Sequence, residues 1–227
     1  PTYNEEKYLQ MLLESIKRQR FKDIEVIVSD APSKDKTQNI AKKFGCKIVK
    51  PSSLPSVARN LGAKAAKARH ILFVDADVIL PDGFLSQLIC NFKNKNYVCA
   101  SVRYKPLSSR FVDKAAFLLI NLSSWLVQRV SPHGAGWCII IRKDVFEKIG
   151  GFNPAYRICE DHDLIKRAAK IGRFGFFLDN FVWVSTRRFN KEGRLNYFAK
   201  VSVIMLVYSI FGVKKAQKLF NYDFGKF

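Results

Sequence analysis

Apolar residues follow two alternating kinds of spacing along the first hundred residues. Between residues 5 and 20 they recur every three to four positions, which predicts a helix with one buried face. The short apolar run at residues 24–28 ends at Ser29 and Asp30 and is typical of a buried strand. Further helices are expected over residues 37–44, 56–68 and 84–92, and further strands over residues 46–49, 71–74 and 97–104. This alternation predicts an α/β fold with a Rossmann-like, mostly parallel central sheet flanked by helices.

The second half continues the alternation and then turns strongly apolar. Helices are expected over residues 112–130, 143–149 and 160–171, with a strand over residues 137–141. Residues 201–213 form an apolar run flanked by lysines, which is shorter than the roughly 20 residues of a membrane span. We therefore expect residues 196–227 to form an amphipathic helical segment that binds a membrane surface. Burial of this segment in the core is an equal alternative.

Composition narrows the class of partner without identifying one. Lys and Arg total 39 against 19 Asp and Glu, so the net charge of +20 favours anionic partners. The basic residues are scattered rather than gathered on one recognition helix, so no nucleic-acid partner is expected. Five cysteines without a CxxC pair argue against a disulfide framework. We therefore expect a cytoplasmic protein, peripheral at the inner face of the cell membrane.

Carboxylates stand where two of the predicted strands end. Asp30 follows the strand over residues 24–28, and Asp75 and Asp77 follow the strand over residues 71–74. In open α/β sheets, ligands bind beyond the carboxyl ends of the strands. Two carboxylates one residue apart can hold Mn²⁺ or Mg²⁺, with diphosphate oxygens completing the shell. An Asp-x-Asp pattern alone is weak, because acids that merely end strands or cap helices are common.

A set of motifs occurs in the order seen in one enzyme family. The motifs are PTYNEE at residues 1–6, VSDAPSKDKT at residues 28–37, Arg59-Asn60-Leu61-Gly62, Asp75-Ala76-Asp77, Gly150-Gly151-Phe152 and Glu160-Asp161. Together they resemble the inverting family 2 glycosyltransferases of the GT-A fold over nearly the whole chain. The resemblance implies a GT-A catalytic domain over residues 1–195, with a nucleotide-sugar-binding half at 1–104 and an acceptor half at 105–195. It also implies a UDP- or GDP-sugar donor.

The resemblance assigns roles to individual residues. The nucleotide sugar is expected against Pro1, Tyr3, Glu5, Val28, Asp30, Arg59, Asp75 and Ala76. Asp77 is the expected direct metal ligand, with Asp75 beside it. On the acceptor side, Glu160 precedes Asp161, which the resemblance assigns as the catalytic base.

Side-chain chemistry extends this set of residues. Arg187 or Arg188 could clamp the diphosphate, because a guanidinium binds phosphate in a bidentate manner. A solvated or lipid-facing basic loop is the alternative for both. Trp137, after Gly136, could stack on an acceptor sugar, although an aromatic residue entering a strand more often belongs to the core.

Three departures from the family pattern refine the expectation. Ser29 replaces the first Asp of the usual pair, and Ala31-Pro32 replace the usual Gly, which leaves nucleotide selectivity open. The family's apolar first strand is expected upstream of Pro1. The Gln-x-x-Arg-Trp motif of the polymerising synthases is absent, and residues 185–189 read STRRF instead. A single transfer is therefore expected.

The acceptor is expected to be a hydroxyl of a glycan or a lipid-linked glycan. A hydroxyl must lose a proton as it attacks, which requires a carboxylate such as Asp161. A polyprenyl phosphate, the alternative acceptor, is already largely ionised near neutrality and needs little help from a base. A more distant alternative, a sugar-nucleotide nucleotidyltransferase, would carry a basic Gly-rich loop where Asn4-Glu5-Glu6 is acidic.

Overall fold

The computed structural model describes residues 1–51 and 54–219. The helices are α1 (Glu6–Lys17), α2 (Thr37–Lys43), α3 (Pro55–Ala65), α4 (Phe84–Asn94), α5 (Phe111–Val127), α6 (Lys143–Lys148), α7 (Glu160–Ala169), α8 (Arg187–Glu192), α9 (Arg194–Phe211) and α10 (Val213–Leu219). The strands are β1 (Ile27–Ser29), β2 (Lys47–Val49), β3 (His70–Val74), β4 (Val78–Ile79), β5 (Cys99–Pro106), β6 (Cys138–Arg142) and β7 (Phe174–Val184).

Two sheets carry the fold. Strands β1 and β2 form a small parallel sheet, and the larger sheet has the order β3-β6-β5-β7-β4. The larger sheet is not mostly parallel as expected: β5 pairs with β7 in parallel, whereas the β3–β6, β5–β6 and β4–β7 pairs are antiparallel. The α/β class with a central sheet flanked by helices is confirmed. The strand directions could not be predicted because they depend on partners far apart in the sequence, such as β4 and β7.

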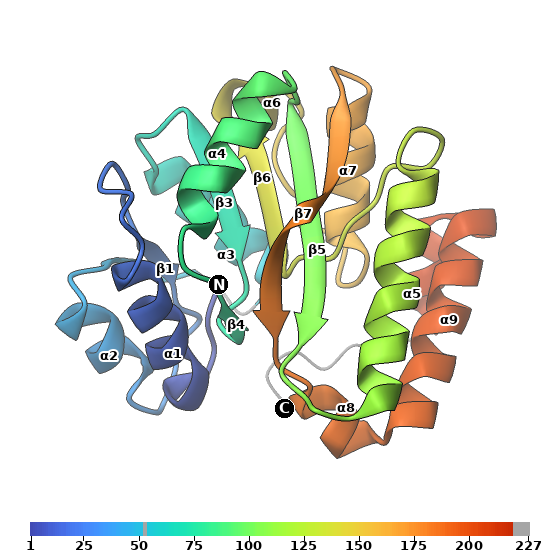
Figure 1. Ribbon diagram of the computed structural model, residues 1–227, viewed down its shortest axis with the longest axis horizontal. Helices are drawn as coiled ribbons and strands as arrows, with labels where there is room; N and C mark the ends of the chain where they lie inside the picture. The colour runs from blue at the N-terminus through green and yellow to red at the C-terminus, as the bar shows by residue number, and fades with distance from the viewer. Residues whose placement is uncertain (52–53, 220–227) are drawn as a thin grey trace.

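The helices cover the sheet from two sides. Figure 1 shows α1 and α2 with β1 on one side of the molecule, and α5 and α9 on the opposite side. The main core lies on the large sheet and is built from strand residues together with Phe84, Phe117, Phe152 and Leu164. A separate small cluster joins Leu9 and Leu13 of α1 to β1 and α2. The apolar face predicted for the first helix therefore packs inward.

The expected elements of the first 171 residues are all present, with ends shifted by a few residues. The strand β7, eleven residues long, has no counterpart in the prediction, and neither do β4 and α8, whereas α9 and α10 fall largely within the helical segment expected over residues 196–227. Most of the apolar run at residues 201–213 lies in the longer helix α9, which ends at Phe211, and Val213 begins α10. Residues 220–227 of the predicted C-terminal segment lie outside the described residues.

Candidate active site

The pairing of strands brings the two predicted halves together at one end of the strands of the large sheet. Because β3 and β6 are antiparallel, Val74 at the end of β3 faces Cys138 at the start of β6. The N–H of Asp75 accordingly donates to the carbonyl of Trp137 over 3.4 Å. The β4–β7 pair brings Asp77 next to Ser185, and the Asp77 carbonyl accepts a hydrogen bond from the N–H of Ser185 over 3.1 Å. The segment from Asp75 to Asp77 therefore makes backbone hydrogen bonds to residues next to β6 and β7, which belong to the predicted acceptor half.

Arg59 joins the acids of the two halves. Its side chain is 5% exposed, and its two terminal nitrogens donate to Oδ1 of Asp75 and Oε1 of Glu160, each over 2.8 Å. A buried guanidinium with two carboxylate partners is held firmly, because removing either partner would leave an uncompensated charge. Arg59 therefore fixes the donor-side Asp75 relative to the start of α7.

The neighbouring motifs lock Arg59 in place. The Asn60 side chain donates to the carbonyl of Phe152 and accepts from the N–H of Phe152, both over 2.8 Å. The ring of Phe152 lies 5.3 Å from the Arg59 guanidinium. Gly151 has a φ of +69°, and a Cβ there would lie 2.6 Å from Oδ1 of Asn60. The Arg-Asn and Gly-Gly-Phe motifs are thus one structural unit, which explains why glycine is needed at position 151.

Arg187 forms a second ionic cluster with Glu5 and Asp77. Its terminal nitrogens bind both carboxylate oxygens of Glu5 over 2.6 and 2.7 Å, and its Nε lies 3.1 Å from Oδ2 of Asp77. The guanidinium also lies over the ring of Tyr8, 4.6 Å from its centre. Arg188 is close enough for its charge to lower the pKa of Asp77. Of the two arginines predicted as a diphosphate clamp, Arg187 therefore contacts the Asp77 carboxylate and Arg188 lies within electrostatic range of it.

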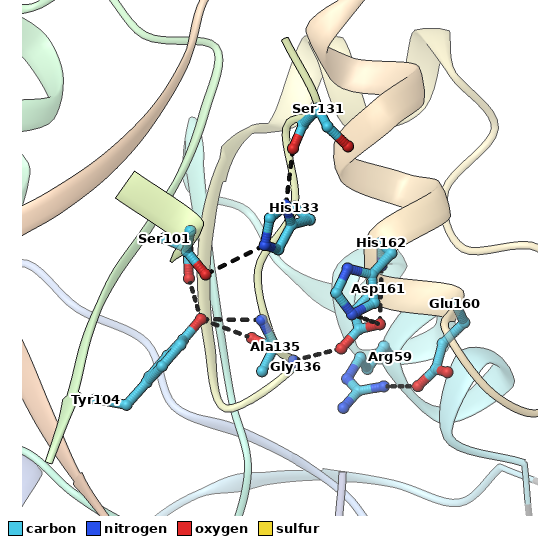
Figure 2. A network of polar contacts seen from close by, with 11 residues as sticks. Arg59, Ser101, Tyr104, Ser131, His133, Ala135, Gly136, Glu160, Asp161 and His162 are labelled. Carbon is cyan, nitrogen blue, oxygen red and sulfur yellow. Dashed lines mark hydrogen bonds and ion pairs between the residues drawn. The ribbon is translucent and has the colours of Figure 1, made fainter. Parts of the chain in front are cut away.

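Asp161 is held by two main-chain N–H groups. Gly136 donates to Oδ2 over 2.6 Å and His162 donates to Oδ1 over 2.8 Å, as Figure 2 shows. Figure 2 also shows the Arg59–Glu160 contact beside this carboxylate. Burial raises the pKa of Asp161, while Arg59 and the two N–H donors oppose that shift. The result is a positioned carboxylate with more than ordinary basicity.

Two further carboxyl groups of the site have raised pKa values. Burial raises the pKa of Asp77 to about 6, with Arg187 acting against the shift and Asp75 adding to it. Burial and the neighbouring Asp161 raise the pKa of Glu160 to about 7 against the effect of Arg59. Clustered acids with raised pKa values are typical of functional sites.

Asp30 occupies a buried polar pocket beside the start of the chain. Its carboxylate accepts hydrogen bonds from the hydroxyls of Thr2 and Ser33 over 2.8 and 2.6 Å, and from the amide of Gln38 over 2.7 Å. Residue 2 also pairs with residue 30 as a parallel β-bridge. The opening segment and the end of β1 therefore form one surface, where the nucleotide was predicted, although the Asp30 carboxylate has partners within the chain.

Two of the predicted contact residues also pack against apolar clusters. The side chain of Val28 packs with Leu9 and Leu13 and supports β1, and its contact with a nucleotide sugar stays a prediction. Trp137 stacks on Phe117 with ring centres 5.5 Å apart and meets the edge of Tyr104 at 5.0 Å. The indole of Trp137 is nevertheless partly exposed, so its stacking on an acceptor sugar stays a prediction. Its aromatic neighbours come from β5 and α5, which the local sequence pattern cannot reveal.

The remaining predicted residues lie around these clusters. Ala76 is buried between the two aspartates, and Tyr3 lies in the turn before α1. Pro1 lies within electrostatic range of Arg59 and Asp75. Tyr8 was missed; it lies in the first turn of α1, three residues after Glu5, and its ring contacts the Arg187 guanidinium.

Backbone strain marks the same region. Asn4 and Cys159 have φ values of +54° and +55°, and Asn96 is the other non-glycine residue with positive φ among residues 1–51 and 54–219. Asn4 directly precedes Glu5, and Cys159 directly precedes Glu160. Left-handed conformations cost free energy outside glycine and cluster at functional sites. Both strained residues aim an acidic residue into the site.

The oxygen ligands of Asp75 and Asp77 fit a hard divalent cation in chemical type. Within the part of the chain that the structure describes, no group of three or more His, Cys, Asp or Glu side chains could hold a metal ion. Substrate oxygens and water would therefore have to complete the shell. Arg187 already contacts Asp77 through its Nε, so a bound cation would compete with or replace this contact.

The chain is similar to proteins of known and unknown activity. An uncharacterized glycosyltransferase of Haemophilus influenzae is 27% identical over 177 residues, which cover 73% of this chain and 58% of that protein. The poly(ribitol-phosphate) beta-N-acetylglucosaminyltransferase TarS of Staphylococcus aureus is 32% identical over 146 residues, covering 58% of this chain and 26% of TarS. The chain therefore spans about half of the first relative and about a quarter of TarS.

Solved structures show the same fold. The structure of TarS residues 1–349 in complex with UDP-GlcNAc matches with a TM-score of 0.67 at 25% identity, over 82% of this chain and 57% of that one. A mannosyltransferase from Pyrobaculum calidifontis, in complex with GDP-Man and Mn²⁺, matches with a TM-score of 0.65 at 20% identity, over 81% of this chain and 54% of that one. Residues 1–150 match the model of the family described as Glycosyl transferase family 2. That match covers well over half of the chain, which therefore belongs to the family 2 glycosyltransferases.

Proposed function

We propose that the chain transfers one sugar, with inversion, from a UDP- or GDP-sugar to a hydroxyl of a glycan or lipid-linked glycan. The observation that carries this proposal is the Arg59 bridge, which ties Asp75 at the end of β3 to Glu160 beside Asp161. The proposed donor site and the proposed catalytic base are thereby held at fixed positions relative to each other. Fixed geometry of this kind is what a displacement between two bound substrates requires.

The donor side is supported by charge and by the neighbours. TarS has been solved with UDP-GlcNAc and the Pyrobaculum enzyme with GDP-Man, both nucleotide-diphosphate sugars. In this chain Arg187 is paired with Glu5, so its guanidinium can exchange one oxyanion partner for another without losing a charge contact. We infer that a bound diphosphate takes over part of the Arg187 guanidinium.

We infer that Asp77, with Asp75 beside it, holds Mn²⁺ or Mg²⁺. When bound, the cation would neutralise negative charge on the departing nucleotide diphosphate. The raised pKa of Asp77, about 6, means that its carboxyl group is largely ionised at neutral pH but not in mildly acidic solution. Metal binding should therefore weaken below about pH 6, because the ligand must lose its proton first.

The acceptor side is supported by the position of Asp161. A sugar hydroxyl loses its proton as it attacks the anomeric carbon, and a carboxylate with a raised pKa accepts that proton more readily. The N–H groups of Gly136 and His162 keep the carboxylate in one orientation. Inversion follows from a single displacement in which the base and the leaving group lie on opposite faces of the sugar.

The test combines donor binding with turnover. Purified chain is titrated with UDP and GDP in the presence of Mn²⁺ or Mg²⁺, and hydrolysis or transfer is followed over a panel of nucleotide sugars. Asp161→Asn should retain nucleotide affinity and lose at least about a hundredfold in kcat, the usual scale of general-base catalysis. NMR of the product should show an inverted anomeric centre.

Asp163→Asn is the matched control for the helix N-terminus. Asp163 lies in the same first turn of α7 but pairs with Arg167. It should leave kcat within a few-fold of the parent value. Full activity of Asp161→Asn would disprove the base assignment, and would favour a phosphate acceptor instead of a hydroxyl. Absence of UDP and GDP binding would disprove the donor class.

A further inference from the structure

Helix α5 has its polar side facing inward. Its buried residues are Asp113, Phe117, Asn121 and Ser124, of which three are polar. The outward positions carry large apolar side chains, among them Leu118, Leu119, Leu122, Trp125 and Leu126. Leu119 is 67% exposed and Leu126 is 62% exposed. A helix that faces water shows the reverse arrangement, so the outer side of α5 is built for an apolar partner.

The inward polar groups have partners within the chain, so the reversal is not a packing fault. Asn121 exchanges two hydrogen bonds with the backbone of Tyr104, over 2.8 and 2.9 Å. Ser124 contacts the ring of His133 over 3.3 Å. Asp113 accepts hydrogen bonds from Ser108 and from Arg194. The helix is thus fixed in this orientation by specific contacts.

Helix α9 presents a second exposed apolar surface. By length and composition, its 18 residues could cross a membrane, yet only 6% of them are buried inside the molecule. Leu195, Leu206, Ile210 and Phe211 are among the exposed residues. A core helix would be mostly buried, so α9 is not one, although Tyr208 packs with Ile158, Val213 and Ala216 in a small buried cluster.

The first turns of α5 and α9 are in contact with each other. Arg194, the first residue of α9, binds both carboxylate oxygens of Asp113 in the first turn of α5, over 2.7 and 3.0 Å. Phe189 of α8 contacts Phe117 of α5 and Tyr197 of α9, with ring centres 5.9 and 4.7 Å away. Figure 1 shows both helices at the end of the molecule opposite α1 and α2. Their exposed apolar residues therefore belong to one end of the protein.

The positive charge around this surface favours an anionic lipid partner over a second copy of the chain. Exposed cations accompany this surface at Arg110, Lys114, Arg129, Lys214, Lys215 and Lys218. Residues 107–133 contain one acid, Asp113, and residues 187–219 contain one, Glu192. These two acids are paired with Arg194 and Lys200. A second copy of the chain would bring the same positive charge against it, whereas acidic headgroups over an apolar layer would meet both features.

We propose that the outer faces of α5 and α9 form a docking surface for an anionic lipid bilayer. The apolar side chains enter the boundary between headgroups and acyl chains, and the surrounding lysines and arginines bind the headgroups. Helix α8 begins at Arg187, whose side chain contacts Glu5 and Asp77. Helix α9 starts directly after α8, at Arg194. Helix α8 thereby connects the Arg187 cluster of the active site to the docking surface.

The test is flotation of the whole chain with vesicles of phosphatidylcholine alone or with about a third phosphatidylglycerol. Binding to the anionic vesicles is expected, with loss in high salt. The variants Leu119→Gln/Leu126→Gln and Leu206→Gln/Ile210→Gln should each weaken it at least about tenfold, because each removes two exposed apolar side chains that would enter the bilayer. The matched control is Met11→Gln/Ile171→Gln, which alters two apolar residues that are also exposed but lie outside α5 and α9. The control should bind like the parent.

A second measurement does not depend on the double variants. Trp125 lies on the outer face of α5, so brominated lipids should quench part of the tryptophan emission of the parent chain and less of Trp125→Phe. No binding to either vesicle, or equal binding to neutral vesicles, would overturn the proposal. A dimer in solution that dissociates in the double variants, with vesicle binding unchanged, would also overturn the proposal.

Discussion

At the scale of single residues, Gly136 is a position in the site where a side chain has no room. A Cβ on Gly136 would lie 2.6 Å from Nη2 of Arg59 and 3.5 Å from Oδ2 of Asp161. Gly136→Ala should therefore push Arg59 away from Asp75, lower kcat/KM at least about tenfold and destabilise the fold by about 1–3 kcal/mol. Steady-state kinetics and chemical denaturation measure the two effects.

The matched control for this change is Gly62→Ala. A Cβ at Gly62, inside α3, would meet only Ser29 Cβ, at an ordinary 3.7 Å. Alanine there should be neutral or stabilise the helix by up to about 1 kcal/mol. Unchanged kinetics in Gly136→Ala would show that the Arg59 bridge tolerates displacement.

The buried carboxyl of Asp77 gives stability a predictable pH dependence. Its pKa is raised to about 6 from 3.8, so between these values the folded chain holds a proton that the unfolded chain has lost. The free energy of unfolding therefore falls as pH rises through this window, by an amount on the order of 3 kcal/mol. Asp77→Asn should show a shallower fall in denaturation experiments from pH 4 to pH 7. Asp82→Asn, which changes a side chain that is 80% exposed, should keep the parent slope.

At the scale of elements, local patterns predicted what local contacts determine. The helices through α7 and the strands β1, β2, β3, β5 and β6 were expected because periodicity and turn residues encode them. The acids at strand ends were found for the same reason. The contacts that make them a site, Arg59 to Glu160 and Arg187 to Glu5, join residues 101 and 182 positions apart. No sequence pattern within one element could reveal these pairs, nor the stacking of Trp137 on Phe117.

Helix α8 brings a charge that should compete with the cation. Arg187 Nε lies 3.1 Å from Asp77, and two like charges near 4 Å repel by on the order of 4 kcal/mol at the permittivity of a protein surface. Without nucleotide, Arg187→Ala should therefore bind Mn²⁺ at least about tenfold more tightly than the parent, measured by calorimetry or by the spin-resonance signal of free Mn²⁺. Arg18→Ala, which alters an arginine at the C-terminal end of α1 that pairs with Asp82, should not change the affinity. Equal or weaker Mn²⁺ binding by Arg187→Ala would show that the arginine and the cation do not share Asp77.

At the scale of the whole molecule, the net charge of +20 acts on every anionic ligand. A positive field concentrates a nucleotide diphosphate near the site, and salt weakens that field as the screening length falls from about 10 Å at 0.1 M to about 3 Å at 1 M. The inhibition constants of UDP and GDP should therefore rise several-fold between these salt concentrations. The uncharged nucleosides uridine and guanosine provide the matched control, since their affinities should change little. If nucleosides and nucleotides respond alike, the salt effect acts on the fold, and the field has no part in capturing the donor.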